Sequence, residues 1–129
     1  MILALRTDKP DAEVYIYDNG KQRIAHTWHA ERQLANQLLG VLRDQLAKVD
    51  ADFTAITGIV VFQGPGSFTG LRIGITVANS LAYGLEVPVV TTQGNDWLVR
   101  GLARLQSGNN DRLALPHYGA EASISKPKK

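Results

Sequence analysis

The residues best suited to chemistry in this chain of 129 residues lie in a glycine-rich stretch, QGPGSFTGLRIG, at 63–74. A short apolar run at 59–62 precedes it and an apolar segment follows it, which is typical of a buried strand that turns into a helix. Such a turn presents backbone N–H groups at the positive end of the helix, where they can bind a phosphate. It can equally let a partner's backbone approach closely, so this stretch leaves two kinds of function open.

The loop within this stretch is the candidate phosphate or nucleotide site, although it matches known phosphate loops only in part. It lacks the lysine of a P-loop and does not follow the GxGxxG pattern. Ser67 or Thr69 could simply cap the next helix, which supports a tight turn at least as well as an anion site. The residues that would line a phosphate are Gly64, Pro65, Gly66, Ser67, Thr69 and Gly70.

Two histidines, His26 and His29, with Glu31 close by, are the other candidates for chemistry. A zinc site needs three or four convergent ligands, and the remaining histidine, His117, lies in a weakly patterned part of the chain. Surface or capping histidines are the better interpretation, so we predict no metal site. We assign no catalytic residue either, because a nucleophile and its base are not visible from spacing alone.

The composition indicates one soluble domain with a weak basic excess. The formal net charge is +2, and part of it comes from Lys126, Lys128 and Lys129 near the C-terminus. We find no charge clustered with aromatic residues, so we do not expect the chain to bind RNA directly. The sequence contains no cysteine, no apolar run as long as a membrane span and no signal-peptide core at its start. We therefore expect a cytoplasmic protein.

The hydrophobic periodicity predicts elements in the order βββαβαβα. An Asn-Gly pair at 19–20, between two extended runs, predicts a hairpin. We expect strands at 2–5, 11–18, 22–28, 54–62 and 87–91, and helices at 30–49, 70–84 and 94–105. This order predicts an α/β fold with a mixed five-stranded sheet, as in a single ribonuclease H-like or actin-like (ASKHA) lobe. The lobe would occupy 1–106, followed by a linker and flexible C-terminal tail at 107–129.

The two long predicted helices carry faces that could meet another subunit. In the first, apolar side chains that include Leu34, Leu38 and Leu42 fall on one broad arc. In the second, small residues recur at every fourth position from 70 to 82, which forms a ridge that another backbone can approach closely. Packing of this ridge on the chain's own sheet and packing on a partner are about equally supported.

The turn after the first strand, Arg6-Thr7-Asp8, argues against nucleotide hydrolysis. In actin-like nucleotide-hydrolysing folds this turn usually offers an acidic residue to a magnesium–phosphate group. Here Arg6 is a fixed cation that would repel Mg²⁺, and Asp8 is more simply a turn former. We therefore do not expect independent ATPase activity.

Taken together, these residues resemble those of the TsaB (YeaZ) family. Three segments carry the resemblance: 2–5 before a threonine-containing turn, His29-Ala30-Glu31 at the start of the first helix, and GPGSFTGLRIG at 64–74. The resemblance covers about 2–93, with a weaker similarity at Pro116-His117-Tyr118.

Two features depart from the family pattern. The family's first turn normally reads Asp-Thr-Ser, where this chain has Arg6-Thr7-Asp8. The family's second actin-like lobe has no room between Gln93 and Leu115, so we expect a shortened form with only the N-terminal lobe. A complete nucleotide cleft between two lobes cannot then form within one chain.

The resemblance implies a non-catalytic scaffold or activator subunit for making threonylcarbamoyladenosine (t6A) in tRNA. Its helices would dock on the catalytic TsaD-type transferase, with a TsaE-type ATPase as a further partner, tRNA reached only through the complex, and a homodimer when alone. No cofactor would be bound tightly, and ATP or ADP would enter only within the complex. The expected interface residues are Leu34, Leu38, Leu42, Gly70, Leu71, Gly74, Ile75 and Ala78.

The alternative is a small nucleotide-binding or phosphotransfer enzyme that uses the loop at 64–70 as its phosphate site. A magnesium-dependent titration with ATP distinguishes the two hypotheses. Tight stoichiometric binding that tolerates a large residue at Gly74 would favour the enzyme.

Overall fold

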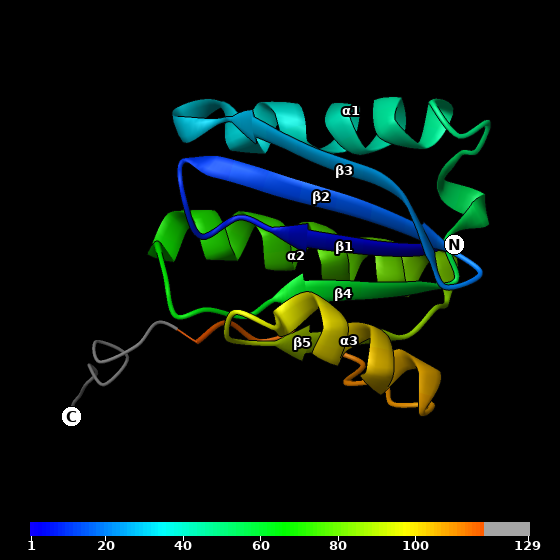
Figure 1. The fold of residues 1–129 in the computed structure, drawn as a ribbon. Helices are drawn as coiled ribbons and strands as arrows, with labels where there is room; N and C mark the ends of the chain where they lie inside the picture. The colour runs from blue at the N-terminus through cyan, green and yellow to red at the C-terminus, as the bar shows by residue number, and fades with distance from the viewer. Residues whose placement is uncertain (118–129) are drawn as a thin grey trace.

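The structure is a computed structural model that describes residues 1–117, and these contain one five-stranded sheet. The strands are β1 (Ile2–Arg6), β2 (Asp11–Asp18), β3 (Lys21–His29), β4 (Gly58–Phe62) and β5 (Val89–Thr92), in the spatial order β3-β2-β1-β4-β5. β2 is antiparallel to β1 and β3, whereas β4 is parallel to β1 and β5. The predicted mixed five-stranded sheet is therefore confirmed (Figure 1).

The turn between β2 and β3 follows from its two residues. Asn19 and Gly20 both have positive φ angles, of 53° and 78°, which a two-residue type I′ turn requires. Along β2 the side chains alternate, with Ala12, Val14 and Ile16 buried on one face. The hairpin predicted from the Asn-Gly pair is confirmed.

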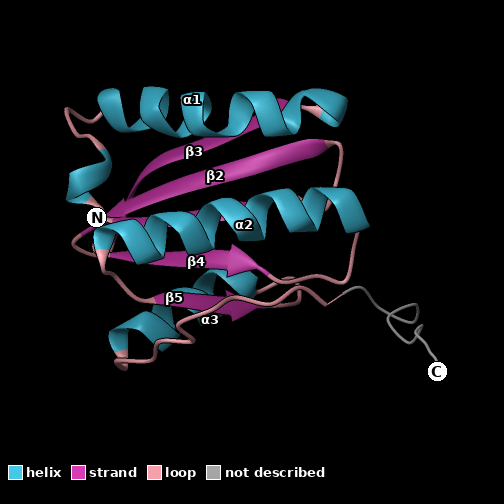
Figure 2. Cartoon of the chain, turned by 180° about the vertical axis from the view of Figure 1, so that it is seen from behind, coloured by secondary structure: helices cyan, strands magenta, loops and turns pink. Residues whose placement is uncertain are grey.

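Helices cover the two faces of the sheet unequally. α1 (Leu34–Ala47) and α2 (Phe68–Leu85) lie side by side on one face, and the shorter α3 (Trp97–Gln106) lies on the other, over β4 and β5 (Figures 1 and 2). Single 3₁₀ turns at Glu31–Gln33 and Phe53–Ala55 precede α1 and β4. The predicted order of strands and helices is confirmed.

The largest differences from the predicted bounds lie at these 3₁₀ turns. The strand predicted at 54–62 begins only at Gly58, because the Asp52 side chain accepts a hydrogen bond from the Thr54 N–H and turns the chain there. The helix predicted at 30–49 is regularly α-helical only within α1. α1 and β4 both begin later than predicted, because each is preceded by a local turn that the hydrophobic pattern does not indicate.

The main core lies between the sheet and the layer formed by α1 and α2. α1 packs on β2, and α2 packs on β4. Leu38 and Leu42 of α1 and Leu71 of α2 have no exposed surface, and Ile59 of β4 is equally buried. The most regular apolar stripe of each helix therefore packs on the sheet.

α3 covers the second face of the sheet through a small aromatic cluster. Trp97 is buried, and its ring centre lies 5.9 Å from that of Phe62 and 6.0 Å from that of Tyr15. Gly101 lies directly against Val60, where a Cβ would collide with the valine side chain. This close approach lets a helix of 10 residues cover β4.

After α3 the chain returns along β5 and the neighbouring side of α2. Ala114 is buried, and the His117 N–H donates to the Gln63 carbonyl oxygen at 2.8 Å. The described part of the predicted linker and tail at 107–129 thus contacts the lobe. The remainder, 118–129, includes Tyr118 and the basic tail and lies outside the described residues.

Candidate functional site

The glycine-rich loop joins the end of β4 to α2 and is held by hydrogen bonds within the chain. Ser67 caps α2, since its Oγ accepts a hydrogen bond from the Gly70 N–H at 3.4 Å. The Ser67 N–H donates to the Asp8 carbonyl oxygen at 3.2 Å, which ties the loop to the turn after β1. The N–H groups of Ser67 and Gly70 are therefore engaged within the chain, as in a tight turn with a helix cap.

The turn after β1 places an ion pair beside the loop. Asp8 lies against Gly66, where a Cβ would collide with it. Arg6 Nε donates to Asp8 Oδ1 at 2.7 Å, and the guanidinium lies 3.9 Å from the centre of the Phe62 ring. Because Asp8 neutralises Arg6, the pair adds no net attraction for a phosphate. Phosphate binding by the loop at 64–70 stays a prediction.

The small-residue ridge of α2 packs on the chain's own β1–β2 turn. Thr7 is 2% exposed, and its hydroxyl donates to the Gly70 carbonyl oxygen at 2.7 Å. A Cβ at Gly70 would collide with the Thr7 carbonyl oxygen, and one at Gly74 would collide with the Thr7 side chain. Packing on the chain's own sheet, one of the two alternatives that the sequence left open, therefore accounts for these glycines.

The structure buries most of the residues that we expected at a partner interface. At most 4% of the surface remains exposed for Leu34, Leu38, Leu42, Leu71, Ile75 and Ala78. Gly74 is also buried, and Gly70 is partly buried. These six side chains are sealed between a helix and its own sheet, so they cannot touch a partner while the chain stays folded. The prediction that these six contact a partner directly is therefore wrong. Their periodicity identified the face that forms the core, not the face that meets solvent.

The outer side of the α1–α2 layer carries an apolar groove that the sequence analysis missed (Figure 2 shows the two helices side by side). The groove has a volume of about 340 Å³ and is lined by Ala35, Phe68, Thr69, Arg72, Ile73, Thr76 and Val77. Phe68 is 55% exposed, and Leu39, one turn along α1 from Ala35, is 52% exposed. Large apolar side chains that gather on an exposed face are typical of a docking surface.

The outward spacing on α2 could have revealed this groove. Phe68, Arg72 and Thr76 recur at every fourth residue, on a different face from the buried Leu71 and Ile75. The Arg72 guanidinium lies 5.6 Å from the centre of the Phe68 ring. An aromatic residue within an otherwise polar outward row is the signal to look for.

A polar cluster with shifted pKa values lies on the opposite face of the sheet. The Tyr15 hydroxyl donates to Glu13 Oε1 at 2.7 Å, and Lys9 Nζ donates to Glu13 Oε2 at 2.8 Å. Burial, together with the hydrogen bond to Glu13, raises the pKa of Tyr15 to about 12. Burial acts to raise the pKa of Glu13, but the hydrogen bonds from Lys9 and Tyr15 outweigh it and lower that pKa. At neutral pH the Tyr15 hydroxyl stays a donor and the Glu13 carboxylate an acceptor, so these hydrogen bonds hold the side chains of Lys9, Glu13 and Tyr15 together on this face of the sheet.

The two histidines make structural contacts on β3. His29 Nδ1 lies 2.8 Å from Asp11 Oδ1, and the His26 ring stacks on Trp28 with centres 5.6 Å apart. Within residues 1–117, no three or more His, Cys, Asp or Glu side chains are grouped so that they could hold a metal ion. None of the helices in that range is both long and apolar enough to cross a membrane.

Proteins of tRNA modification are similar to this chain in sequence. The model of the family described as TsaD, tRNA N6-adenosine threonylcarbamoyltransferase, matches residues 27–106. The chain is 30% identical over 118 residues to the tRNA threonylcarbamoyladenosine biosynthesis protein TsaB of Escherichia coli (strain K12), a match that covers 87% of this chain and 51% of that protein. It is 43% identical over 61 residues to the tRNA N6-adenosine threonylcarbamoyltransferase of Geotalea daltonii, which covers 47% of this chain and 18% of that one.

A solved structure agrees with the sequence matches. YeaZ from Pseudomonas aeruginosa is similar with a TM-score of 0.69 and 32% identity, over 83% of this chain and 49% of that chain. The predicted ribonuclease H-like or actin-like fold is confirmed by this likeness. The chain spans about half the length of the TsaB and YeaZ relatives that it matches over most of its own length.

Proposed function

Because the chain belongs to the TsaB/YeaZ family, we propose that it is a non-catalytic scaffold or activator subunit in the synthesis of t6A in tRNA. It docks on a catalytic TsaD-type transferase through the outward faces of α1 and α2. It reaches tRNA only through that complex, and the reacting groups belong to the transferase.

The observation that carries this proposal is the apolar groove between α1 and α2. The two helices run side by side, and their outer ridges leave a groove of the kind that a partner's helices fill when ridges pack into grooves. Phe68 stands at this groove with more than half of its surface exposed. Burying that surface in an interface would contribute on the order of 1–2 kcal/mol, as expected of an aromatic residue near the centre of an interface.

The groove also favours a particular partner chemistry. Ile73 and Val77, both half-buried, line the groove and suit aliphatic side chains on a facing helix. Arg72, an exposed residue that also lines the groove, favours a carboxylate on the partner. A TsaD-type partner of related fold would present its equivalent helices, so that the two pairs form a bundle.

The α1–α2 face also accounts for self-association and for the further partners. In the absence of the transferase, a second copy covers it and forms a homodimer. A TsaE-type ATPase joins the assembly, and ATP or ADP enters only there, near Thr69, which lies in the first turn of α2 next to the glycine-rich loop and lines the groove. The assembly is cytoplasmic.

A charged substitution in the groove tests the docking surface. Phe68→Glu places a carboxylate in the groove, and Val99→Glu is the matched control, because Val99 is 70% exposed on α3 at the other face of the sheet. The affinity of each protein for the TsaD-type transferase of the same organism is measured by isothermal titration calorimetry. We expect Phe68→Glu to weaken binding at least about tenfold and Val99→Glu to leave it unchanged.

The activator role has a separate readout, the rate of t6A formation on tRNA with and without this chain. Equal affinities for the unaltered chain and both variants would refute the docking surface. A rate that does not depend on the chain, despite tight binding, would refute the activator role and leave the docking surface in place.

A further inference from the structure

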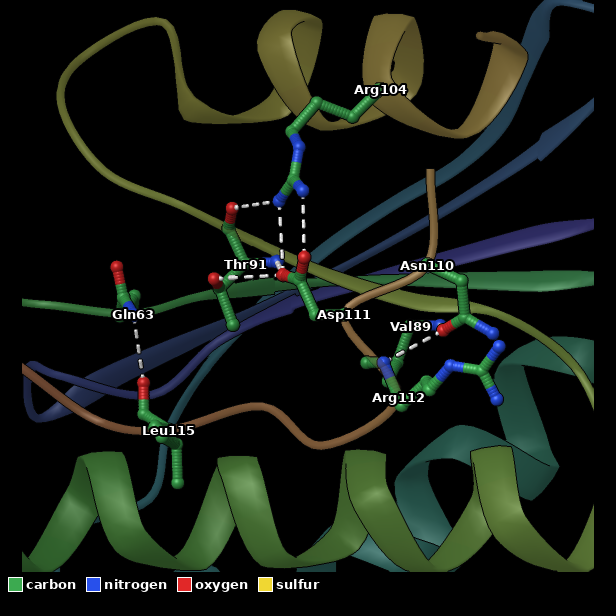
Figure 3. Close-up of polar contacts among 8 residues, drawn as sticks. All are labelled: Gln63, Val89, Thr91, Arg104, Asn110, Asp111, Arg112 and Leu115. Carbon is green, nitrogen blue, oxygen red and sulfur yellow. Dashed lines mark hydrogen bonds and ion pairs between the residues drawn. The ribbon is translucent and has the colours of Figure 1, made fainter. Parts of the chain in front are cut away.

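The outer edge of the sheet at β5 is closed by three side chains and one backbone N–H group instead of by another strand. β4 bonds to the carbonyl oxygens of Pro88 and Thr92, so the backbone N–H and C=O groups of Val89 and Thr91 point away from it. Backbone groups left unpaired at such an edge are a template for pairing with another strand. Figure 3 shows the residues that cover these groups.

All four outward groups of Val89 and Thr91 have a partner. The Val89 N–H donates to Asn110 Oδ1 at 3.1 Å, and the Val89 carbonyl oxygen accepts from the Asp111 N–H at 2.8 Å. The Thr91 N–H donates to Asp111 Oδ2 at 2.8 Å, and the Thr91 carbonyl oxygen accepts from Arg104 Nη1 at 3.0 Å. We call Arg104, Asn110 and Asp111 the edge guard, because together they occupy every position at which a further strand would bond.

The edge guard is held together by its own ion pair. Arg104 Nη2 donates to Asp111 Oδ1 at 2.6 Å and Nη1 to Oδ2 at 2.9 Å, a two-pronged arrangement (Figure 3). The Thr91 hydroxyl also donates to Asp111 Oδ2, at 3.1 Å. Paired, charge-assisted hydrogen bonds of this kind fix geometry as well as adding stability.

The chain that follows the edge guard is fastened to α2 and to the end of β4. The Ala114 N–H donates to Asn79 Oδ1 at 2.7 Å, and Asn79 Nδ2 donates to the Ala114 carbonyl oxygen at 3.0 Å. Gln63 Nε2 donates to the Leu115 carbonyl oxygen at 2.9 Å. The edge guard is therefore anchored from both sides, by α3 before it and by these contacts after it.

The sequence of β5 explains why such a guard is needed. All four residues, Val-Val-Thr-Thr, are β-branched and uncharged, a composition that favours strand pairing. β3 is the strand at the opposite edge of the sheet, and it carries Lys21 and Arg23, charges of the kind that discourage edge pairing. β5 has no such charge of its own, so the protection comes from α3 and the segment after it.

We propose that the edge guard prevents β5 from pairing with β5 of a second copy of this chain. The edge is self-complementary. A two-fold axis through Val90 would set Val89 of one copy opposite Thr91 of the other, and the two residues would exchange hydrogen bonds on both sides of the axis. Self-association of the intact chain is thereby limited to its other surfaces.

The test removes both side-chain acceptors with the double variant Asn110→Ala/Asp111→Ala. Asp96→Ala is the matched control, since it breaks the exposed ion pair between Asp96, the N-cap residue of α3, and Arg100 of α3, and neither residue belongs to the edge guard. Both proteins also carry Phe68→Glu, which removes association through the α1–α2 groove. Sedimentation over a range of protein concentrations then gives the dimerisation constant of the remaining surfaces, and amide hydrogen exchange reports on the Thr91 N–H. We expect the double variant to dimerise at least about tenfold more tightly than the control, with protection of the Thr91 amide that rises with concentration.

A third change assigns the association to β5. Thr91→Pro removes an N–H that points away from β4, so β4 pairing is kept, and adding it to the double variant should restore the dimerisation constant of the control. An unchanged dimerisation constant together with faster exchange at Thr91 would overturn the proposal and leave the network a purely stabilising one. If the double variant does not fold, Arg104→Met, which frees the Thr91 carbonyl oxygen, is measured in the same way, and unchanged dimerisation overturns the proposal.

Discussion

Replacement of Gly74 by alanine distinguishes a ridge that packs on its own chain from one that packs on a partner. The added Cβ would collide with the side chain of Thr7. Thr7 is buried, and its hydroxyl is held by the 2.7 Å hydrogen bond to the Gly70 carbonyl oxygen. Thr7 cannot rotate away without losing that hydrogen bond, so we expect Gly74→Ala to destabilise the fold.

The expected magnitude follows from three contributions to the free energy of unfolding. Overpacking at a close contact costs about 1–3 kcal/mol, and loss of the Thr7 hydrogen bond costs about 1 kcal/mol. Alanine in place of glycine inside a helix stabilises the helix by about 1 kcal/mol, which offsets part of this loss. The net loss for Gly74→Ala is then roughly 2 kcal/mol.

Gly84→Ala is the matched control, because Gly84 also lies in α2 but a Cβ there meets nothing within 4 Å. It should raise the free energy of unfolding by up to about 1 kcal/mol. Urea denaturation followed by tryptophan fluorescence measures both variants. Folded Gly74→Ala protein should still bind the TsaD-type transferase as the unaltered chain does. Equal denaturation midpoints for the two variants, or lost docking by a fully stable Gly74→Ala protein, would refute the reasoning.

Three further predictions concern the ion pairs. Asp111→Ala should lower the free energy of unfolding by about 2–3 kcal/mol at neutral pH, because hydrogen bonds to Arg104 and Thr91 are lost; an unchanged Tm would contradict this. The hydrogen bonds from Arg104 hold the pKa of Asp111 below its ordinary value of 3.8. This stabilisation is therefore complete above about pH 4 and is lost as the pH falls through the lowered pKa. Acid should thus reduce the difference in the free energy of unfolding between the unaltered chain and Asp111→Ala. A difference that stays constant with pH in urea denaturation would argue against this pKa shift. Calorimetry should find only weak Mg–ATP binding by the isolated chain and tighter inorganic phosphate binding by Asp8→Ala, because Asp8 neutralises Arg6 beside the loop; tight ATP binding by the unaltered chain would favour the enzyme alternative.

The strands and their order were predictable because short-range signals determine them. Asn19 and Gly20 specify a two-residue turn, and the change from alternating to helical periodicity after residue 29 marks the end of the meander. The helix and strand starts near 31–33 and 53–55 were less predictable, since side-chain and backbone hydrogen bonds of single turns set them.

Whether the small-residue ridge and the apolar stripe face the chain's own sheet or a partner was not predictable, because that depends on contacts between residues far apart in the chain. The ridge of α2 meets Thr7, which lies 63 positions before Gly70. An apolar stripe has the same period whether it faces its own sheet or a partner. The stripe at Leu34, Leu38 and Leu42 therefore predicted a helix correctly and its contacts incorrectly. Phe68 in the outward row of α2 was a sequence signal for an exposed apolar face, but the shape of the groove also depends on the position of Ala35 in α1.

Site-specific cross-linking tests most directly whether the α1–α2 face docks on a TsaD-type transferase. The chain contains no cysteine, so Thr76→Cys in the groove and Val99→Cys on α3 each provide a single attachment point for a photoreactive label. In the assembled complex, we expect label at position 76 to cross-link to the transferase and label at position 99 to leave it unmodified. Cross-linking from position 99 alone, in a complex that forms normally, would contradict the account.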